Sequence, residues 1–144
     1  MKQIVLIATV FLFSNRILGQ NTEGSKPLPM LPIEWIQRLA DSCTLVDYTY
    51  LTLPITMALD NKKSIQQSLR HIGIGAFEQT KCRLFAKIFY QINGRVALVA
   101  DAYFTVGCVY FVYNVDGVPM FSNPMSTEGV EFFNQIIARQ EKKK

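Results

Sequence analysis

The chain has 144 residues, of which 49% are hydrophobic and 12% aromatic, so one ordinary domain can bury a core without metal ions or many disulfides. The formal net charge is +4, from fifteen cations and eleven acids. Three of these cations form the terminal run 142–144, and two more, Lys2 and Arg16, precede residue 20. The body of the chain is therefore near neutral. Because nucleic-acid binding needs a basic face, this distribution argues against nucleic acid as a partner.

Residues 1–19 have the three-part layout of a secretory signal. Lys2 supplies a positive lead, residues 4–13 form a stretch that is apolar except for Thr9, and Gly19 is a small residue before the polar Gln20. The apolar stretch is shorter than the roughly 20 residues that cross a bilayer, and no second stretch follows. We therefore expect cleavage after Gly19 and a secreted or periplasmic product with no transmembrane segment. Arg16 is unusual so near a cleavage site, and an uncleaved anchor is the alternative.

The rest of the chain divides into three parts by composition. Residues 20–32 contain one glycine and three prolines, which predict an extended linker. Residues 33–140 are expected to form a single domain. Residues 141–144 are a lysine tail, which we expect to be a solvated and frayed end.

The first half of the domain is predicted to contain two helices with a strand between them. Apolar residues recur every three or four positions over residues 32–42, which predicts an amphipathic helix that begins near a proline. β-Branched and aromatic residues then favour a strand over residues 45–53, which the following proline ends or bulges. Asp60 or Asn61 can cap a second helix, and Gly73 suits the left-handed residue that ends many helices.

The second half predicts an antiparallel meander. Asn93-Gly94 and Asp116-Gly117 are pairs preferred in tight two-residue hairpins, because both central positions need positive φ. Gly107 marks the turn between them, and Pro119 places the last strand at a sheet edge. The four predicted strands are residues 83–92, 95–105, 108–114 and 118–121. The first of these also fits a helical stripe, but the hairpin that follows it favours a strand.

A final helix completes the domain. Ser126 or Thr127 can cap it, and early glutamates and a late arginine suit the helix dipole. The order is helix, strand, helix, four strands, helix. These elements predict an α+β domain, with an antiparallel sheet of four to five strands and three helices packed mainly on one face. In architecture this resembles the cystatin-like rolls and the rolls of the nuclear-transport-factor type, a likeness that implies no activity.

Three cysteines permit one disulfide and leave one thiol. If Asn93-Gly94 is a two-residue turn, Cys82 and Cys108 lie two strands apart, roughly 10 Å, beyond the ~7 Å reach of a disulfide. A bridge is therefore expected between Cys43 and either Cys82 or Cys108, and three buried thiols are the alternative. With one histidine and no paired-cysteine spacing, the sequence predicts neither a metal site nor a cofactor.

Asp101 and His71 are candidates for catalysis. Asp101 lies in the second meander strand between apolar neighbours, where a carboxylate needs a partner, which could be Arg83, Arg95, Lys87 or a hydroxyl. A catalytic acid in a sheet-lined pocket would have the same surroundings. His71 falls in the last turn of the second predicted helix, and a structural or surface role is favoured for it. Asp47 is a second carboxylate, which could share a site with Asp101 only if their strands adjoin.

Aromatic residues on the meander strands suggest a binding face. The candidates for ligand binding are Tyr103, Tyr110, Phe111 and Tyr113. Alternation places Phe111 and Tyr113 on one face of the sheet and Tyr110 on the other. We expect an exported non-enzymatic domain that binds a protein partner or a small apolar ligand through an aromatic sheet face. Alternatives are full packing of both faces, a small enzyme that uses Asp101, and a homodimer formed through the sheet face or the Pro119 edge.

Overall fold

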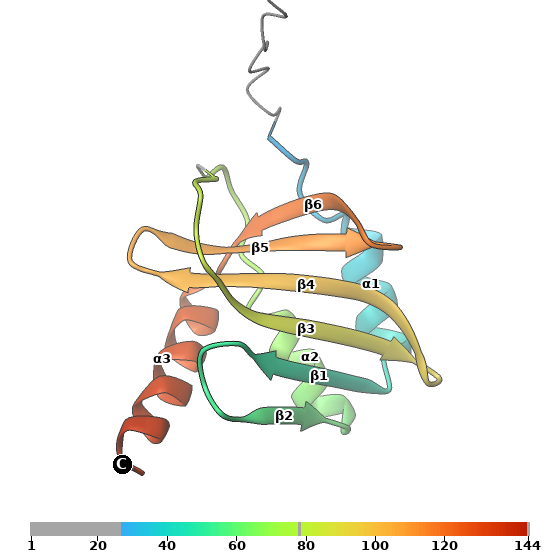
Figure 1. Ribbon diagram of the computed structural model, residues 1–144. Coiled ribbons are helices and arrows are strands. Elements are labelled where there is room, and N and C mark those ends of the chain that lie inside the picture. Colours follow the sequence, from blue (N-terminus) through green and yellow to red (C-terminus); the bar gives the residue numbers. More distant parts are fainter. Residues whose placement is uncertain (1–26, 78, 144) are drawn as a thin grey trace, which may run out of the picture.

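The computed structural model describes residues 27–77 and 79–143 (Figure 1). The predicted secretory signal, residues 20–26 of the predicted linker and the last lysine lie outside this part. In chain order the elements are α1 (Ile33–Ser42), β1 (Leu45–Tyr50), β2 (Thr56–Leu59), α2 (Lys62–Leu69), β3 (Leu84–Ile92), β4 (Arg95–Thr105), β5 (Cys108–Val115), β6 (Val118–Pro124) and α3 (Thr127–Glu141). None of the helices in the described residues has the length and apolar character needed to cross a membrane.

The strands form one antiparallel sheet in the order β2-β1-β3-β4-β5-β6. The α+β class and the meander of β3 to β6 are confirmed, but the sheet has six strands rather than four to five. The additional strand is β2, whose Thr56 lies opposite Thr49 of β1. Pro54 therefore lies in the loop of a β1–β2 hairpin and does not end a single strand.

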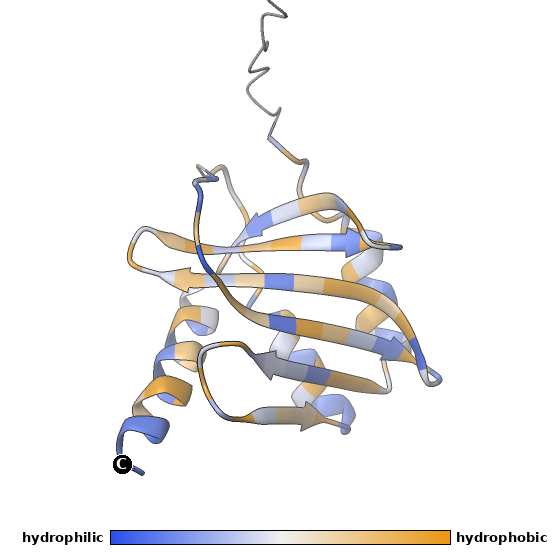
Figure 2. Cartoon of the chain, in the orientation of Figure 1, coloured by the Kyte–Doolittle hydropathy of each residue, from blue (hydrophilic) through white to orange (hydrophobic). Residues whose placement is uncertain are grey.

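The helices α1, α2 and α3 pack on one face of the sheet, which we call the inner face. Figure 2 shows strands that are mostly hydrophobic and interrupted by single hydrophilic residues, as expected where one face is covered. The buried strand residues of the main core are Val46, Tyr48, Tyr50, Phe85, Ala86, Ile88, Tyr90, Leu98, Ala100, Ala102, Phe111 and Tyr113. They pack against buried helix residues, which are Leu39 of α1, Ile65 and Leu69 of α2, and Phe133 and Ile136 of α3.

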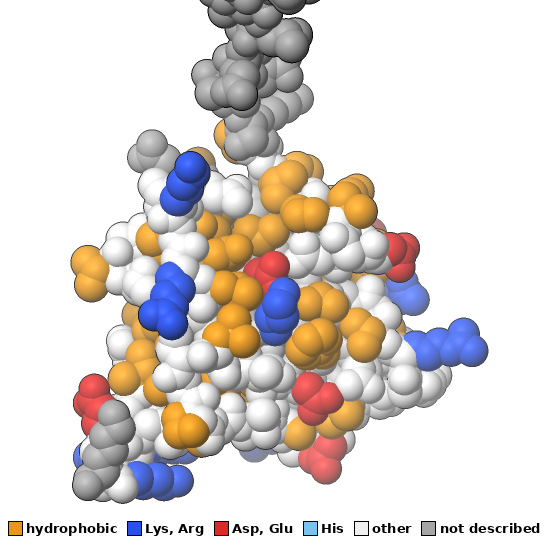
Figure 3. All heavy atoms as spheres, viewed as in Figure 1, with side chains coloured by type: hydrophobic (Ala, Val, Ile, Leu, Met, Phe, Trp, Pro, Cys, Tyr) orange, Lys and Arg blue, Asp and Glu red, His pale blue; other side chains and the backbone are white. Residues whose placement is uncertain are grey.

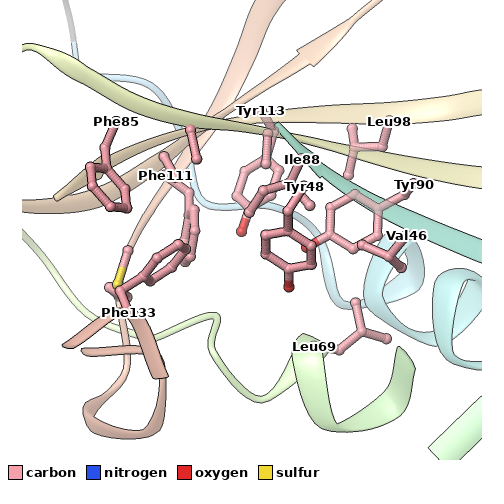
Figure 4. Close-up of a cluster of buried hydrophobic side chains, with 14 of the residues drawn as sticks. Val46, Tyr48, Leu69, Phe85, Ile88, Tyr90, Leu98, Phe111, Tyr113 and Phe133 are labelled. Atoms are coloured by element: carbon pink, nitrogen blue, oxygen red, sulfur yellow. The ribbon is translucent and has the colours of Figure 1, made fainter. Parts of the chain in front are cut away.

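Phe133 of α3 is the centre of an aromatic cluster in this core. Its ring centroid lies 5.7 Å from that of Phe85, 5.3 Å from Phe104 and 6.4 Å from Phe111. In Figure 4, Leu69 of α2 points from the helix layer toward the sheet, beneath Val46 and Tyr48 and apart from Phe133. The burial of these apolar side chains, which is the main favourable contribution to folding, thus stabilises the packing of the helices on the sheet.

The helix caps follow the predicted chemistry. Asn61 Oδ1 accepts a hydrogen bond from the Ser64 N–H, and Ser126 Oγ accepts one from the Gly129 N–H. Gly73 differs from the prediction, because it does not have a positive φ. Instead, a Cβ at this position would lie 2.7 Å from the carbonyl oxygen of Pro124. A glycine is needed here because the backbone of Pro124 lies too close for a side chain, and not because the residue is left-handed.

Part of the predicted linker belongs to the folded domain. The Ser122 N–H donates to the carbonyl oxygen of Pro29 at 2.9 Å, and the Leu31 N–H donates to Asn123 Oδ1 at 2.8 Å. The Leu31 side chain is buried in the main core. The domain therefore begins before residue 33, with residues 28–31 lying against β6. This strand is at one end of the sheet order, as Pro119 predicted.

Candidate functional site

The second face of the sheet, which we call the outer face, is the candidate functional site. Within residues 27–77 and 79–143, no helix covers it. Figure 3 shows hydrophobic side chains on this face, divided by single charged ones. Strand register places on it Asp47, Thr49, Lys87, Phe89, Gln91, Val99, Asp101, Tyr103, Tyr110, Val112 and Asn114. The face has an open part over β1, β3 and β4, and a covered part over β5.

An ion pair lies at the centre of the open part. Lys87 Nζ donates to Asp101 Oδ1 at 2.6 Å, and Asn114 Nδ2 donates to Asp101 Oδ2 at 3.1 Å. The Asp101 side chain is 16% exposed and that of Lys87 is 40% exposed. Both oxygens of Asp101 therefore have a donor, as buried polar groups require. Lys87 is one of the partners that we expected for Asp101 from its position between apolar residues.

Partly exposed apolar side chains flank this ion pair. Val99 and Tyr103 lie on either side of Asp101 along β4, and Phe89 of β3 lies opposite Val99. An ion pair this close to solvent adds little to stability. What the open part offers is apolar and aromatic surface with fixed polar groups between, a composition that protein interfaces share.

Asp47 does not share a site with Asp101, because β3 separates their strands. Gln91 Nε2 donates to Asp47 Oδ2 at 2.7 Å. The condition for a two-carboxylate site, that the two strands adjoin, is not met.

His71 lies away from the outer face, at the junction of α2 and α3. It is 7% exposed, and its ring stacks on Phe132 with centroids 4.6 Å apart. Burial lowers the pKa of His71 to about 4, and the nearby Glu128 carboxylate opposes that shift. Because α2 ends at Leu69, His71 lies just beyond the helix turn predicted to contain it. His71 packs as a neutral ring and does not meet Asp101.

The covered part of the outer face is a small second core. Its buried residues are Cys108, Tyr110 and Val112 of β5, packed against Leu28, Phe77, Cys82 and Tyr103. The Phe77 ring stacks on Tyr110 with centroids 5.2 Å apart, and Tyr110 Oη donates to the carbonyl oxygen of Thr80 at 2.8 Å. Figure 1 shows the connection from α2 to β3 passing in front of β5 and β4 on this face.

A disulfide between Cys82 and Cys108 corrects the predicted pairing. Their Cα atoms are 6.1 Å apart, and Cys43 is free. Cys108 does lie opposite Thr105, as the turn at Gly107 predicted. Cys82, however, precedes β3, which begins at Leu84, so it is outside the sheet. The distance argument was wrong because it kept Cys82 in the plane of the sheet. The segment that precedes β3 instead passes over β5 and β4 on the outer face and brings Cys82 next to Cys108.

Of the four predicted ligand-binding residues, the structure leaves one accessible. Phe111 and Tyr113 face the inner core and are 2% and 0% exposed, while Tyr110 is 3% exposed beneath Phe77. Tyr103 is partly exposed in the open part. Phe89 and Val99 were not among the predicted residues. Alternation along β4 places Val99 on the face of Tyr103, but Phe89 reaches this face only because the β3–β4 register shifts between Tyr90 and Gln91.

An apolar hollow lies elsewhere, between residues 30–33 and the end of α2. Its volume is about 480 Å³, within the range of small-molecule pockets, and Ile36, Leu69 and Ile72 are among its lining residues. The lining includes the amide of Asn123, which already accepts from the Leu31 N–H and donates to the carbonyl oxygen of Gly73. The hollow therefore offers apolar surface but no free side-chain amide to orient a ligand.

Comparison with known proteins adds no functional assignment. No group of three histidine, cysteine or acidic side chains that could hold a metal ion comes together in the described residues. No protein-family model matches the chain, and no curated protein or solved structure is significantly similar to it.

Proposed function

We propose that this protein is an exported non-enzymatic domain that binds a partner protein through the open part of its outer face. The observation that supports this most directly is the partial exposure of Phe89, Val99 and Tyr103 around the Lys87–Asp101 pair. Tyrosine suits such a surface because its ring is apolar and its hydroxyl remains polar. A surface that extends over three strands matches a protein better than it matches a small molecule.

Two observations support export. Residues 1–19 have the layout of a secretory signal, and the domain contains a disulfide. Disulfides persist in oxidising compartments and are rare in the cytosol. Both features are consistent with a secreted or periplasmic domain.

The alternative functions have less support. Asp101 has a donor at each carboxylate oxygen, and His71 lies on the other side of the sheet. A general acid or base needs a reacting group within hydrogen-bond reach, and in the described residues both oxygens of Asp101 are already engaged by Lys87 and Asn114. The apolar hollow could accept a neutral ligand, but its amide is already engaged.

Site-specific photo-crosslinking in cells that export the protein tests the binding face. A photoreactive amino acid at position 89 is expected to give a discrete adduct with a second protein, because this position lies in the open part. The matched control carries the same amino acid at the exposed position 135 of α3. A Val99→Glu change should abolish the adduct from position 89. No adduct at 89, or the same adducts from both positions, would contradict the proposal.

A further inference from the structure

The surroundings of the Cys82–Cys108 disulfide favour thiol exchange. Thr80 Oγ1 lies 3.1 Å from Cys82 Sγ and 3.6 Å from Cys108 Sγ, so one hydroxyl can serve either sulfur. Lys81 and Arg83 flank Cys82, and both are exposed. Hydroxyl donors and nearby cations stabilise a thiolate, which is the attacking and the leaving species in exchange. Cys82 is partly exposed, so a reductant can reach it.

The same disulfide anchors the segment that covers β5. Phe77, Thr80 and Cys82 contact Tyr110 or Cys108, and beneath them Tyr110 and Val112 are 3% and 5% exposed. Tyr110 lies directly opposite Tyr103 of the open part. The covered part and the open part are therefore continuous, and the anchored segment sets the boundary between them.

We propose that the Cys82–Cys108 disulfide is an exchangeable latch that controls the extent of the binding face. A thiolate of a dithiol reductant attacks Cys82 Sγ and forms a mixed disulfide with it. The Cys82–Cys108 bond breaks, and Cys108 leaves as a thiolate that takes up a proton. The second thiol of the reductant then displaces Cys82 and closes the reductant's own disulfide. Two electrons pass to the protein, and both cysteines end as thiols.

Reduction releases residues 79–83 from β5, and with them Phe77, whose ring stacks on Tyr110. Tyr110 and Val112 then join Tyr103 in one larger aromatic surface. This consequence for binding rests on the proposed function, whereas the exchange and the release do not.

Alkylation under native conditions tests the exchange. The oxidised protein is treated with dithiothreitol, quenched with iodoacetamide and examined by mass spectrometry. Cys82 and Cys108 are expected to be labelled while far-UV circular dichroism is unchanged. Thr80→Val should slow labelling roughly threefold to tenfold, because it removes one hydrogen bond to the leaving sulfur, whereas Cys43→Ser should not change the rate. Labelling no faster than amide exchange of the β3–β4 core would show that only global unfolding exposes the bridge, and would overturn the latch.

Limited trypsin digestion tests the release. Cleavage after Lys81 and Arg83 should be about tenfold faster, or more, in the reduced and alkylated protein than in the oxidised one. The Cys82→Ser/Cys108→Ser variant should match the reduced protein. Equal cleavage rates would overturn the latch. Because this experiment uses no partner, its failure leaves the binding face intact, whereas loss of the crosslink at position 89 contradicts the binding face alone.

Discussion

Tyr103 and Tyr110 stack across β4 and β5 with ring centroids 4.8 Å apart, yet Tyr103 is partly exposed and Tyr110 is 3% exposed. The difference arises because Phe77 stacks on the second ring and leaves the first uncovered. Burial raises the pKa of both tyrosines, so both hydroxyls are protonated at neutral pH. This pair marks the boundary between the open and covered parts of the outer face.

Truncation of two phenylalanines should separate the two faces of the sheet. Phe111→Ala is expected to lower the free energy of unfolding by about 3–5 kcal/mol, because Phe111 is buried in the inner core. Phe89→Ala should cost about 1 kcal/mol, because its side chain is only partly buried. Urea denaturation of the two variants makes the comparison. Equal losses would contradict the assignment of Phe89 to an open surface.

Removal of the disulfide should destabilise the domain without changing its sheet. The bridge joins residues 26 positions apart, and loop closure of that length corresponds to about 3.5 kcal/mol. The Cys82→Ser/Cys108→Ser variant should lose stability of this order in urea denaturation. Cys43→Ser is the matched control, since Cys43 is free. A loss in the control equal to that in the double variant would show that cysteine burial, and not the bridge, is responsible.

The hydroxyl of Tyr113 should lower the stability of the folded domain. Within the described residues it is buried and has no hydrogen-bond partner. Tyr113→Phe is therefore expected to raise the free energy of unfolding by about 1 kcal/mol. Tyr110→Phe is the contrasting change, because it removes the bond to the Thr80 carbonyl and should cost about 1 kcal/mol. Calorimetry of both variants decides the matter, and a loss of stability in Tyr113→Phe would indicate a partner for its hydroxyl.

His71 should make the domain less stable in acid. Its pKa is about 4 in the folded state and near 6.5 in the unfolded chain, so the unfolded chain binds the proton more readily. The contribution of His71 is therefore complete above about pH 6.5 and is lost as the pH falls toward 4, by an amount of order 3 kcal/mol.

Urea midpoints between pH 7 and pH 4.5 measure this loss. The His71→Phe variant keeps a ring against Phe132 and should lose less stability over that interval than the wild type. Parallel curves for the two proteins would rule out His71 as the titrating group.

Export should leave a defined N-terminus. Intact-mass measurement of the protein recovered outside the cytoplasm is expected to show a chain that begins at Gln20, because Gly19 is the small residue ahead of the predicted cut. Arg16→Ala should leave the cleavage point unchanged. Recovery of a membrane-bound product that retains residues 1–19 would instead favour the uncleaved anchor.

Local chemistry determined most of the secondary structure. Asn93 and Asp116 have positive φ in the turns where each precedes a glycine, as those pairs predicted. Strand β2 was missed because its four residues have no distinctive pattern of their own, and their pairing depends on β1. Likewise, alternation assigned Phe111 and Tyr110 to opposite faces but could not say which face the helices would cover.

The sequence by itself determined the turns, the helix caps and the alternation of the meander, because these depend on neighbours within a few residues. Only the tertiary structure decided the Cys82–Cys108 pairing, the burial of Tyr110 and the exposure of Tyr103. These three features depend on where the connection from α2 to β3 crosses the sheet. That path is set by contacts between residues distant in the chain, such as the approach of Gly73 to Pro124, which no local pattern encodes.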